Sequence, residues 1–284
     1  MAMSAVLVDG SSFVYRAYFG LPPLTDGENR PVGAVYGFCS ALMTMLNKYA
    51  SDLFCVALDS GRKTFRSDIY PEYKSSRHET PQDLKTQFPM IREACAAFGV
   101  PVVAKNGFEA DDVIATYTEK LSSAGYEVRI MGSDKDLMQL VGEKITLCDP
   151  IKSKRIGPKE VQEKYGVLPS QMAYLQALMG DSADNIPGIS GIGPKMAAEL
   201  LREFGTLDGI YQNIDKIKRL KIRQSLIDQR DQLKIFLKLV TLVRDMEVEE
   251  DYRDFRISRN RDRLVDFMKS HNFDLLLRRL DSVA

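Results

Sequence analysis

Short apolar runs alternate with longer amphipathic stretches through the first half of the chain. The runs with the length and side chains of buried strands are 4–8, 54–58, 100–104, 127–132 and 144–148. The stretches with helical periodicity are 33–50, 81–98, 109–124 and 134–141. Thr80 and Pro81 are expected to cap and begin the second of these helices. The alternation predicts an α/β fold whose central, mostly parallel sheet carries helices on both faces.

The pattern changes near residue 158, where strand-like runs stop and helical periodicity continues alone. We therefore expect two parts, an α/β region over residues 1–157 and a helical region over 158–284. Within the second part, a Gly/Pro-rich turn at 186–194 separates two helical stretches and fits a helix–hairpin–helix at about 169–204. Backbone N–H groups brought together at such a turn can hold a phosphate at a helix N-terminus.

Carboxylates stand where the expected strands and helices meet. Asp9 and Asp59 close apolar runs, and Asp134 follows a third. In a parallel sheet those strand ends lie on one edge, and ligands bind in the crevice outside it. The remaining acids lie at the ends of expected helices or beside the turn. The full set of nine is Asp9, Asp59, Glu109, Asp111, Asp112, Asp134, Asp136, Asp181 and Asp184.

Acids that converge in this way repel one another unless cations lie between them. Carboxylate oxygens are the ligands that Mg²⁺ and Mn²⁺ prefer, and paired ions of this kind are used to cut phosphodiesters. Several of the acids also have a purely structural interpretation. Glu109, Asp111 and Asp112 would favour a helix N-terminus through its dipole, and Asp181 and Asp184 suit a turn.

Basic residues are clustered although the net charge is zero, with 39 Lys and Arg against 39 Asp and Glu. A basic and aromatic insertion at about 60–80 interrupts the alternation, and the 216–223 segment carries five bases and no acid. An acidic site flanked by surfaces that bind phosphate would have this polarity. For 216–223, a solvated helix face is the simpler interpretation.

Other features of the sequence narrow the class of protein. No apolar stretch approaches the length of a membrane span and no leader pattern opens the chain, so we expect a cytosolic protein with no membrane partner. The cysteines are far apart and are expected as buried, reduced thiols: Cys39, Cys55, Cys95 and Cys148. Only two histidines are present, which argues against a zinc site.

Six short motifs, in order along the chain, carry a resemblance. They are Leu7–Gly10, Ala34–Phe38, Phe65-Arg66 with Tyr70–Lys74, Gly107–Asp112, Ser133–Asp136, and Gly180–Gly188 running into Gly191–Gly193. Each motif alone is weak, but six in this order and spacing are specific. Over nearly its whole length the chain resembles the 5′ nuclease domain of bacterial DNA polymerase I, a relative of the flap endonucleases.

The resemblance implies a role for each of the nine acids. Around a first metal ion it places Asp9, Asp59 and Asp111. Around a second it places Asp134, Asp136 and Asp181, with Glu109 near both. Asp112 and Asp184 would act through water. The implied cofactors are two, or three, Mg²⁺ or Mn²⁺ ions.

The resemblance also implies the residues that act on DNA and bind it. Lys74, helped by Arg77, would neutralise the scissile phosphate beside the metal-binding Asp9 and Asp134. DNA contacts would come from Tyr15, Arg66, Tyr73, Lys74, Arg77, Gly188, Gly191, Gly193 and Lys195. The carbonyls of Ile189 and Ile192 would hold K⁺ or Na⁺ at the helix–hairpin–helix.

A metal-dependent, structure-specific 5′ nuclease is therefore the expected function, with both 5′→3′ exonuclease and 5′-flap endonuclease activity in DNA replication and repair. The implied partners are DNA with a 5′ flap, a nick or a free 5′ end, and RNA–DNA hybrids. We expect a monomer in the bacterial cytosol, associated with the nucleoid. The chain ends after Leu275–Leu280, where the polymerase domains of a full polymerase would follow, so we expect either an excised or truncated polymerase domain or a free-standing relative.

Two other classes of function stay open at this point. A PIN-like ribonuclease could use a similar acidic sheet edge, although the expected hairpin and basic insertion argue against it. A non-catalytic, structure-specific DNA-binding module is the other. The full set of acids argues against that class, because acids repel phosphate and add nothing to simple binding.

Overall fold

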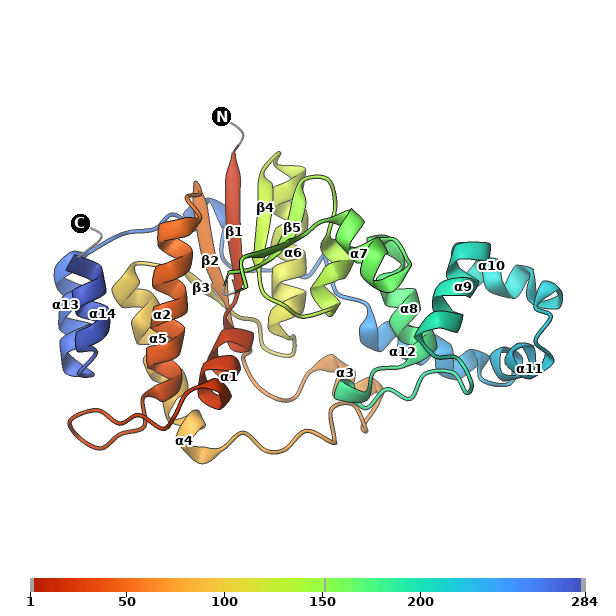
Figure 1. Ribbon diagram of the computed structural model, residues 1–284, viewed down its shortest axis with the longest axis horizontal. Coiled ribbons are helices and arrows are strands. Elements are labelled where there is room, and N and C mark those ends of the chain that lie inside the picture. Colours follow the sequence, from red (N-terminus) through yellow and green to blue (C-terminus); the bar gives the residue numbers. More distant parts are fainter. Residues whose placement is uncertain (1–2, 151, 282–284) are drawn as a thin grey trace.

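A six-stranded sheet organises the first half of the chain in the computed structural model, which describes residues 3–150 and 152–281 (Figure 1). The strand order is β3-β2-β1-β4-β5-β6. The strands are β1 (Ser4–Asp9), β2 (Leu53–Ala57), β3 (Val102–Val103), β4 (Glu127–Met131), β5 (Ile145–Asp149) and β6 (Lys154–Ile156). All pairings are parallel except that of β5 with β6. The mostly parallel α/β sheet is confirmed.

Both faces of the sheet carry apolar side chains, and helices cover both of them. Along β1, Val6 and Val8 belong to the apolar cluster on one face, while Ala5 and Leu7 belong to the cluster on the other. The first face packs against α1 (Gly10–Gly20), α2 (Gly33–Lys48), α5 (Gln87–Phe98), α13 (Arg261–Ser270) and α14 (Asp274–Asp281). The last two return from the far end of the chain to lie beside α2 and α5 (Figure 1).

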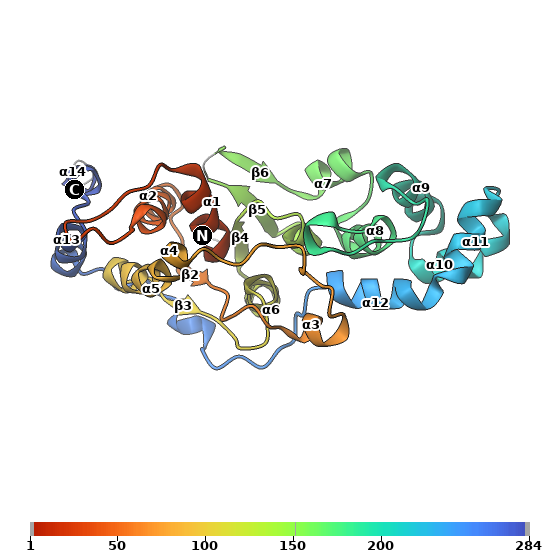
Figure 2. The same cartoon turned by 90° about the horizontal axis from the view of Figure 1, so that it is seen from below.

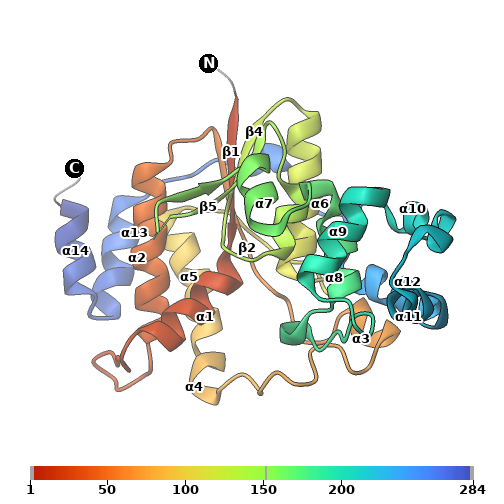
Figure 3. The ribbon, with the colours of Figure 1, turned by 45° about the vertical axis from the view of Figure 1, so that its right-hand side comes forward.

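The second face carries α6 (Ala110–Ser123) and leads into the helical part of the chain. The helices that follow are α7 (Pro158–Tyr165), α8 (Met172–Met179), α9 (Pro194–Phe204), α10 (Leu207–Gln212), α11 (Leu220–Asp228) and α12 (Arg230–Val240). They extend to one side of the sheet (Figures 1 and 3), and one apolar cluster runs from the sheet face into them. In the described part of the chain, no helix combines the length and apolar character needed to cross a membrane.

The prediction of a single helix over residues 81–98 is wrong. The segment forms α4 (Gln82–Lys85) and then α5, with Pro81 preceding the first of them. The side chain of Gln87 accepts hydrogen bonds from the backbone N–H groups of Ala34 and Val35, at 2.9 and 3.3 Å, and so caps α2. Thr80 does not cap a helix, because its hydroxyl is hydrogen-bonded to that of Tyr15 at 3.0 Å.

Among the elements that were not predicted are α1 and β6. α1 follows β1 without a break, and its first turn is capped by Asp9, whose carboxylate accepts from the Ser12 N–H at 3.0 Å. The exposed strand β6 has only three residues, too few for a periodic signal. The insertion at 60–80 carries a short helix, α3 (Phe65–Ile69), and runs from β2 across to α4 (Figure 2).

A buried ion pair fastens this insertion to the rest of the molecule. Arg66 and Asp112 are 1% and 0% exposed, and the guanidinium donates to both carboxylate oxygens at 2.5 and 2.7 Å. Arg66 also donates to the carbonyls of Leu239 (2.7 Å) and Thr241 (3.2 Å) at the end of α12. The backbone N–H of Val243 donates to Asp112 at 3.0 Å. The pair therefore joins α3, α6 and α12.

This geometry corrects two expectations from the sequence. Arg66 is expected at the DNA surface, but its side chain lies in the interior and cannot reach a duplex. Asp112 is expected to act at the metal ions through water, but its oxygens already accept from Arg66, from Val243 and from the Glu109 N–H at 3.2 Å. A buried charge needs this many partners to offset the loss of water.

Replacing Asp112 with Ala should lower the free energy of unfolding by about 3–5 kcal/mol, because Arg66 would keep a buried charge without its partner. Asp111→Ala, one position earlier on α6, is the matched control. It removes one of several converging like charges, so in EDTA the free energy of unfolding should stay constant or rise. Urea denaturation followed by circular dichroism measures both. Equal losses in the two variants would contradict a structural role for Asp112.

Candidate active site

The carboxyl edge of the sheet gathers a first group of acids. Asp9 ends β1, and Asp59 lies two residues beyond β2. Asp59 accepts from the backbone N–H of Ala110 at 2.9 Å, which holds it against the start of α6 and so against Asp111. Asp134 lies three residues beyond β4, at the same edge. The parallel strand order thus brings acids from four separate segments together.

The electrostatics show how close these acids lie. Burial raises the pKa of Asp9 to about 7, and repulsion from Asp59 and Asp134 adds to the effect. Burial also raises the pKa of Asp111 well above its usual value, with contributions from Asp9, Asp134, Asp136 and Asp59. At neutral pH such groups stay partly protonated unless positive charge is brought to them.

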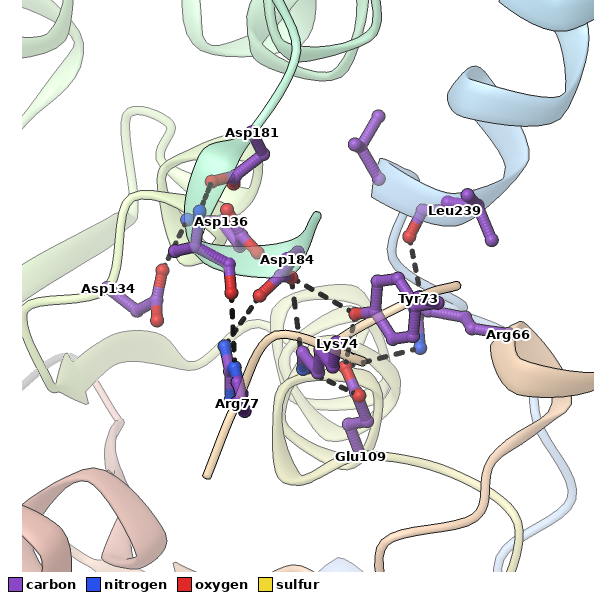
Figure 4. Close-up of polar contacts among 12 residues, drawn as sticks. Arg66, Tyr73, Lys74, Arg77, Glu109, Asp134, Asp136, Asp181, Asp184 and Leu239 are labelled. Carbon is purple, nitrogen blue, oxygen red and sulfur yellow. Dashed lines mark hydrogen bonds and ion pairs between the residues drawn. The ribbon is translucent and has the colours of Figure 1, made fainter. Parts of the chain in front are cut away.

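A second group of acids adjoins the first. One carboxylate oxygen from each of Asp136, Asp181 and Asp184 lies within 4.8 Å of the others (Figure 4). Burial raises the pKa of Asp136 to about 7, with repulsion from Asp134 as the next contribution. Asp134 accepts from the Asp136 N–H at 3.0 Å and also raises the pKa of Asp9, so it stands between the two groups. The structure brings Asp184 into the acid cluster as directly as Asp181.

The loop that carries Asp181 and Asp184 is fixed by close backbone packing. Asp181 and Ile186 exchange backbone hydrogen bonds of 2.7 and 2.8 Å. Gly180 and Gly188 both have positive φ, and a Cβ built on Gly188 would lie 2.3 Å from the Gly180 nitrogen. Only glycine allows the two segments to approach so closely. The acid loop and the hairpin after it therefore form one unit.

The hairpin lies between α8 and α9. Its Ile189 N–H donates to the Leu178 carbonyl at 2.8 Å, while the Ile189 carbonyl accepts from Ile192 at 3.0 Å. The side chains of Ile189 and Ile192 are buried. Exposed positions expected to meet DNA are Gly191, Gly193 and Lys195, at and just before the start of α9. Gly188 is buried against Gly180, so its expected contact with DNA is not available.

Basic side chains from the insertion reach the acid cluster. Lys74 Nζ lies 2.6 Å from Glu109 Oε1 and 3.8 Å from Asp184, and Arg77 lies 2.5 Å from Asp184 (Figure 4). Burial alone would lower the pKa of Lys74, but the carboxylates of Glu109 and Asp184 outweigh it and raise that pKa. Lys74 has a φ of +55°, and its N–H donates to the Asp184 carbonyl at 2.9 Å. The fold holds these cations against the acids despite a strained backbone.

Two aromatic residues expected to contact DNA have partners within the protein. Tyr73 is 7% exposed, and its hydroxyl donates to Glu109 and Asp184, both at 3.1 Å, so its ring offers no stacking surface. Tyr15 is half-buried on α1, where it packs edge-on against Phe88. Its stacking on a terminal base stays a prediction.

Sequence reasoning missed several residues of the site. Lys135 forms an ion pair with Asp181 at 2.7 Å, and the Gln176 amide donates to Asp136 at 2.5 Å. Asn185 donates to the Glu72 carbonyl at 2.9 Å and so ties the insertion to the acid loop. Lys135 could have been suspected from its place between two acids. Nothing in the sequence singles out Gln176, which depends on how α8 packs.

The donors present fit hard divalent cations. They are carboxylate oxygens, close enough together to share an ion, with no thiol or imidazole among them. An acidic sheet edge of this kind, with cations against it and a helical hairpin beside it, defines the class of a metal-dependent nuclease.

Comparison with known sequences places the chain within this class. The sequence profile described as 5′-3′ exonuclease, N-terminal resolvase-like domain, matches residues 4–166. A second, described as 5′-3′ exonuclease, C-terminal SAM fold, matches residues 167–263. The chain therefore belongs to the 5′-3′ exonuclease family. Nothing in these matches supports the PIN-like ribonuclease or the non-catalytic binding module.

Individual relatives differ in length. DNA polymerase I of Rhizobium leguminosarum is 43% identical over 283 residues, which cover 96% of this chain and 28% of that protein. The 5′-3′ exonuclease of Aquifex aeolicus strain VF5 is 37% identical over 278 residues, which cover 98% of this chain and 95% of that protein. The chain thus spans about a third or less of the first DNA polymerase I relatives.

The fold has a solved counterpart. The bacteriophage T5 D15 flap endonuclease, in a pseudo-enzyme–product complex with DNA and metal ions, aligns with a TM-score of 0.68. The alignment covers 99% of this chain and 97% of that chain at 24% identity. At this identity the likeness establishes the shared fold.

Gly188→Ala should lower the free energy of unfolding by about 2 kcal/mol and weaken Mn²⁺ binding, because the added Cβ pushes Gly180 and hence Asp181 away. Gly193→Ala is the matched control in the same hairpin, since a Cβ there has no heavy atom within 4 Å. Thermal unfolding and Mn²⁺ titration by calorimetry measure the two effects. The close packing would be unimportant if both variants behaved as wild type.

Proposed function

We propose that the chain is a structure-specific 5′ nuclease that cuts DNA at a 5′ flap, a nick or a free 5′ end during replication and repair. The observation that carries the proposal is the carboxyl edge itself. Acids from β1, β2, β4, α6 and the loop after α8 meet there, and Lys74 and Arg77 are bonded to two of them. Family membership supports the same conclusion.

The acids are proposed to hold two divalent ions, Mg²⁺ or Mn²⁺, with a third as a further possibility to test. Asp9, Asp59 and Asp111 would hold one, and Asp134, Asp136 and Asp181 the other, with Asp184 beside the second group and Glu109 near both. Bound there, the ions supply a Lewis acid for the phosphate and a lowered pKa for water.

Lys74 and Arg77 are proposed to neutralise the scissile phosphate. Both reach the acid cluster from the insertion, where they now bond to Glu109 and Asp184. A phosphate entering beside the acids would present oxygens to the same two cations. Fixed positive charge at this place stabilises the charge that develops during attack. The products would carry a 5′-phosphate and a 3′-hydroxyl.

The duplex is proposed to bind along the hairpin. Exposed backbone at Gly191 and Gly193 and the side chain of Lys195 lie at the start of α9, where a helix N-terminus favours phosphate. The carbonyls of Ile189 and Ile192 would hold K⁺ or Na⁺, and the basic 216–223 segment would extend the surface. Because phosphate contacts dominate, affinity should fall steeply with salt.

The biological setting is part of the same proposal. RNA primers in RNA–DNA hybrids are proposed as further substrates, and the chain is proposed to act as a monomer in the bacterial cytosol. Where it forms part of a DNA polymerase I, polymerase domains would be its partners. The α/β region (1–157) and the helical region (158–284) would supply the acids and the duplex contacts respectively.

The direct test is cleavage of a 5′-flap duplex labelled at either end, with Mg²⁺ and with EDTA. Release of the flap near the junction, only with the metal, is the expected outcome. A single-stranded RNA of the same length tests selectivity and should remain uncut. Tight binding of the flap without cleavage in Mg²⁺ or Mn²⁺ would overturn the proposal.

Asp134→Asn should abolish cleavage at saturating Mg²⁺ while leaving flap binding intact. Asp134 lies between the two acid groups, so its loss should weaken both metal positions. The amide keeps the shape of the side chain and its acceptor for the Asp136 N–H. Single-turnover kinetics measure the loss of cleavage, and fluorescence anisotropy measures binding of the flap. Intact cleavage would remove Asp134 from the metal site.

Lys74→Ala should lower kcat by about 10²–10³-fold and change KM little, because the cation acts chiefly in the transition state. Lys159→Ala, which removes an exposed charge on α7, is the matched control and should leave both constants unchanged. Steady-state kinetics on the flap substrate separate the two constants. An equal loss in kcat and in DNA binding would contradict a role in the transition state and would show that Lys74 contributes to DNA binding.

A further inference from the structure

A basic cavity on the β4–β5–β6 side of the sheet belongs to neither the acid cluster nor the hairpin. Its volume is about 460 Å³, within the range of small-ligand sites. The cavity is lined by Lys48, Tyr49, Ala50, Arg129, Cys148, Ser153, Lys154 and Arg155. Its lining residues come from the end of α2, from β4, β5 and β6, and from the residues beside them, and the Lys48 ammonium donates to the Ser153 hydroxyl at 2.8 Å.

Four positive charges line this cavity, and no carboxylate does. Lys48 comes from the end of α2, Arg129 from β4, and Lys154 and Arg155 from β6. Over residues 3–150 and 152–281, none of the four forms an ion pair with an acid. Lys48, Lys154 and Arg155 are exposed, so solvent screens part of their repulsion, and an anion bound among them would offset the rest.

The acids nearest in sequence are engaged elsewhere. Asp149, at the end of β5, pairs with Arg16 at 3.3 Å. Glu160 accepts from the Gly157 N–H at 2.7 Å, where it caps α7. In the described residues neither carboxylate forms an ion pair with a β6 cation, although Glu160 attracts Arg155 at longer range.

Arg129 gives the cavity a directional group. It is half-buried, and its hydrogen bond in the described residues is a long one, 3.4 Å from Nη1 to the Ala50 carbonyl. A guanidinium carries five N–H donors in a planar fork that matches a phosphate. Tyr49 supplies a half-buried aromatic ring in the same lining. A nucleotide base could stack on such a ring.

We propose that this cavity is a second phosphate-binding site, which takes the phosphate ester of a nucleotide or of a nucleic-acid strand. Arg129 would bind the phosphate oxygens in a bidentate manner, with Lys48, Lys154 and Arg155 around them. The site shares no residue with the acid cluster, so it stands or falls independently of the proposed nuclease activity.

The test is isothermal titration calorimetry of the full chain with inorganic pyrophosphate in EDTA at low salt. EDTA prevents divalent ions from holding phosphate at the acid cluster. Pyrophosphate should bind wild type, and Arg129→Gln and Lys154→Gln should each weaken binding by about tenfold or more. Arg92→Gln, which removes an exposed cation on α5 outside the cavity, is the matched control and should have no effect.

Two more probes distinguish the sources of phosphate. If the ligand is a nucleotide, ADP should bind more tightly than pyrophosphate, and Tyr49→Leu should remove that advantage. If the ligand is a nucleic-acid strand, a short oligothymidylate should displace pyrophosphate, and Arg129→Gln should lower the affinity for the oligonucleotide. ADP should then bind no more tightly than pyrophosphate.

Thermal unfolding of each variant confirms that it folds. Lys154 is exposed on an edge strand, so Lys154→Gln keeps the test decisive if Arg129→Gln unfolds. No pyrophosphate binding by wild type, or equal binding by wild type and the cavity variants, would overturn the proposal.

Discussion

Repulsion among carboxylates at one edge of a parallel sheet is the constraint on which the rest of this structure depends. The strand order makes the repulsion unavoidable, because β1, β2 and β4 are neighbours or near neighbours and each leads into an acid. Burial makes it stronger, as the raised pKa values of Asp9 and Asp136 show. A protein that keeps such an edge must bring positive charge to it, from its own side chains or from bound ions.

The chain supplies part of that charge through the insertion and the acid loop. Lys74, Arg77 and Lys135 are bonded to acids of the cluster, and Tyr73 and Asn185 fasten the same segments together. In the proposed function, these cations lie where the scissile phosphate enters. The arrangement that stabilises the acids is therefore also one suited to binding a substrate. The buried Arg66–Asp112 pair anchors the insertion that makes this possible.

Acidic and basic residues gather at different places in the molecule, although the chain as a whole has no net charge. Acids occupy the carboxyl edge, while basic residues line the cavity beside α2 and Lys195 lies at the exposed start of α9. For a protein that handles phosphates this separation matters more than the sum. In the proposed function, affinity and position come from the basic surfaces, whereas the acids serve chemistry that needs metal ions.

The sequence by itself determined the α/β alternation, the carboxyl edge and most of the acids, because period and strand-end position are local properties. It could not tell Asp111 from Asp112, which are adjacent on α6 and point to different partners. Burial decided that Asp112 neutralises Arg66, and that Tyr73 and Gly188 pack inside. An expected helix is interrupted beside Gln87, whose side chain caps another helix. Those outcomes depend on contacts between segments distant in sequence, which only the tertiary structure decided.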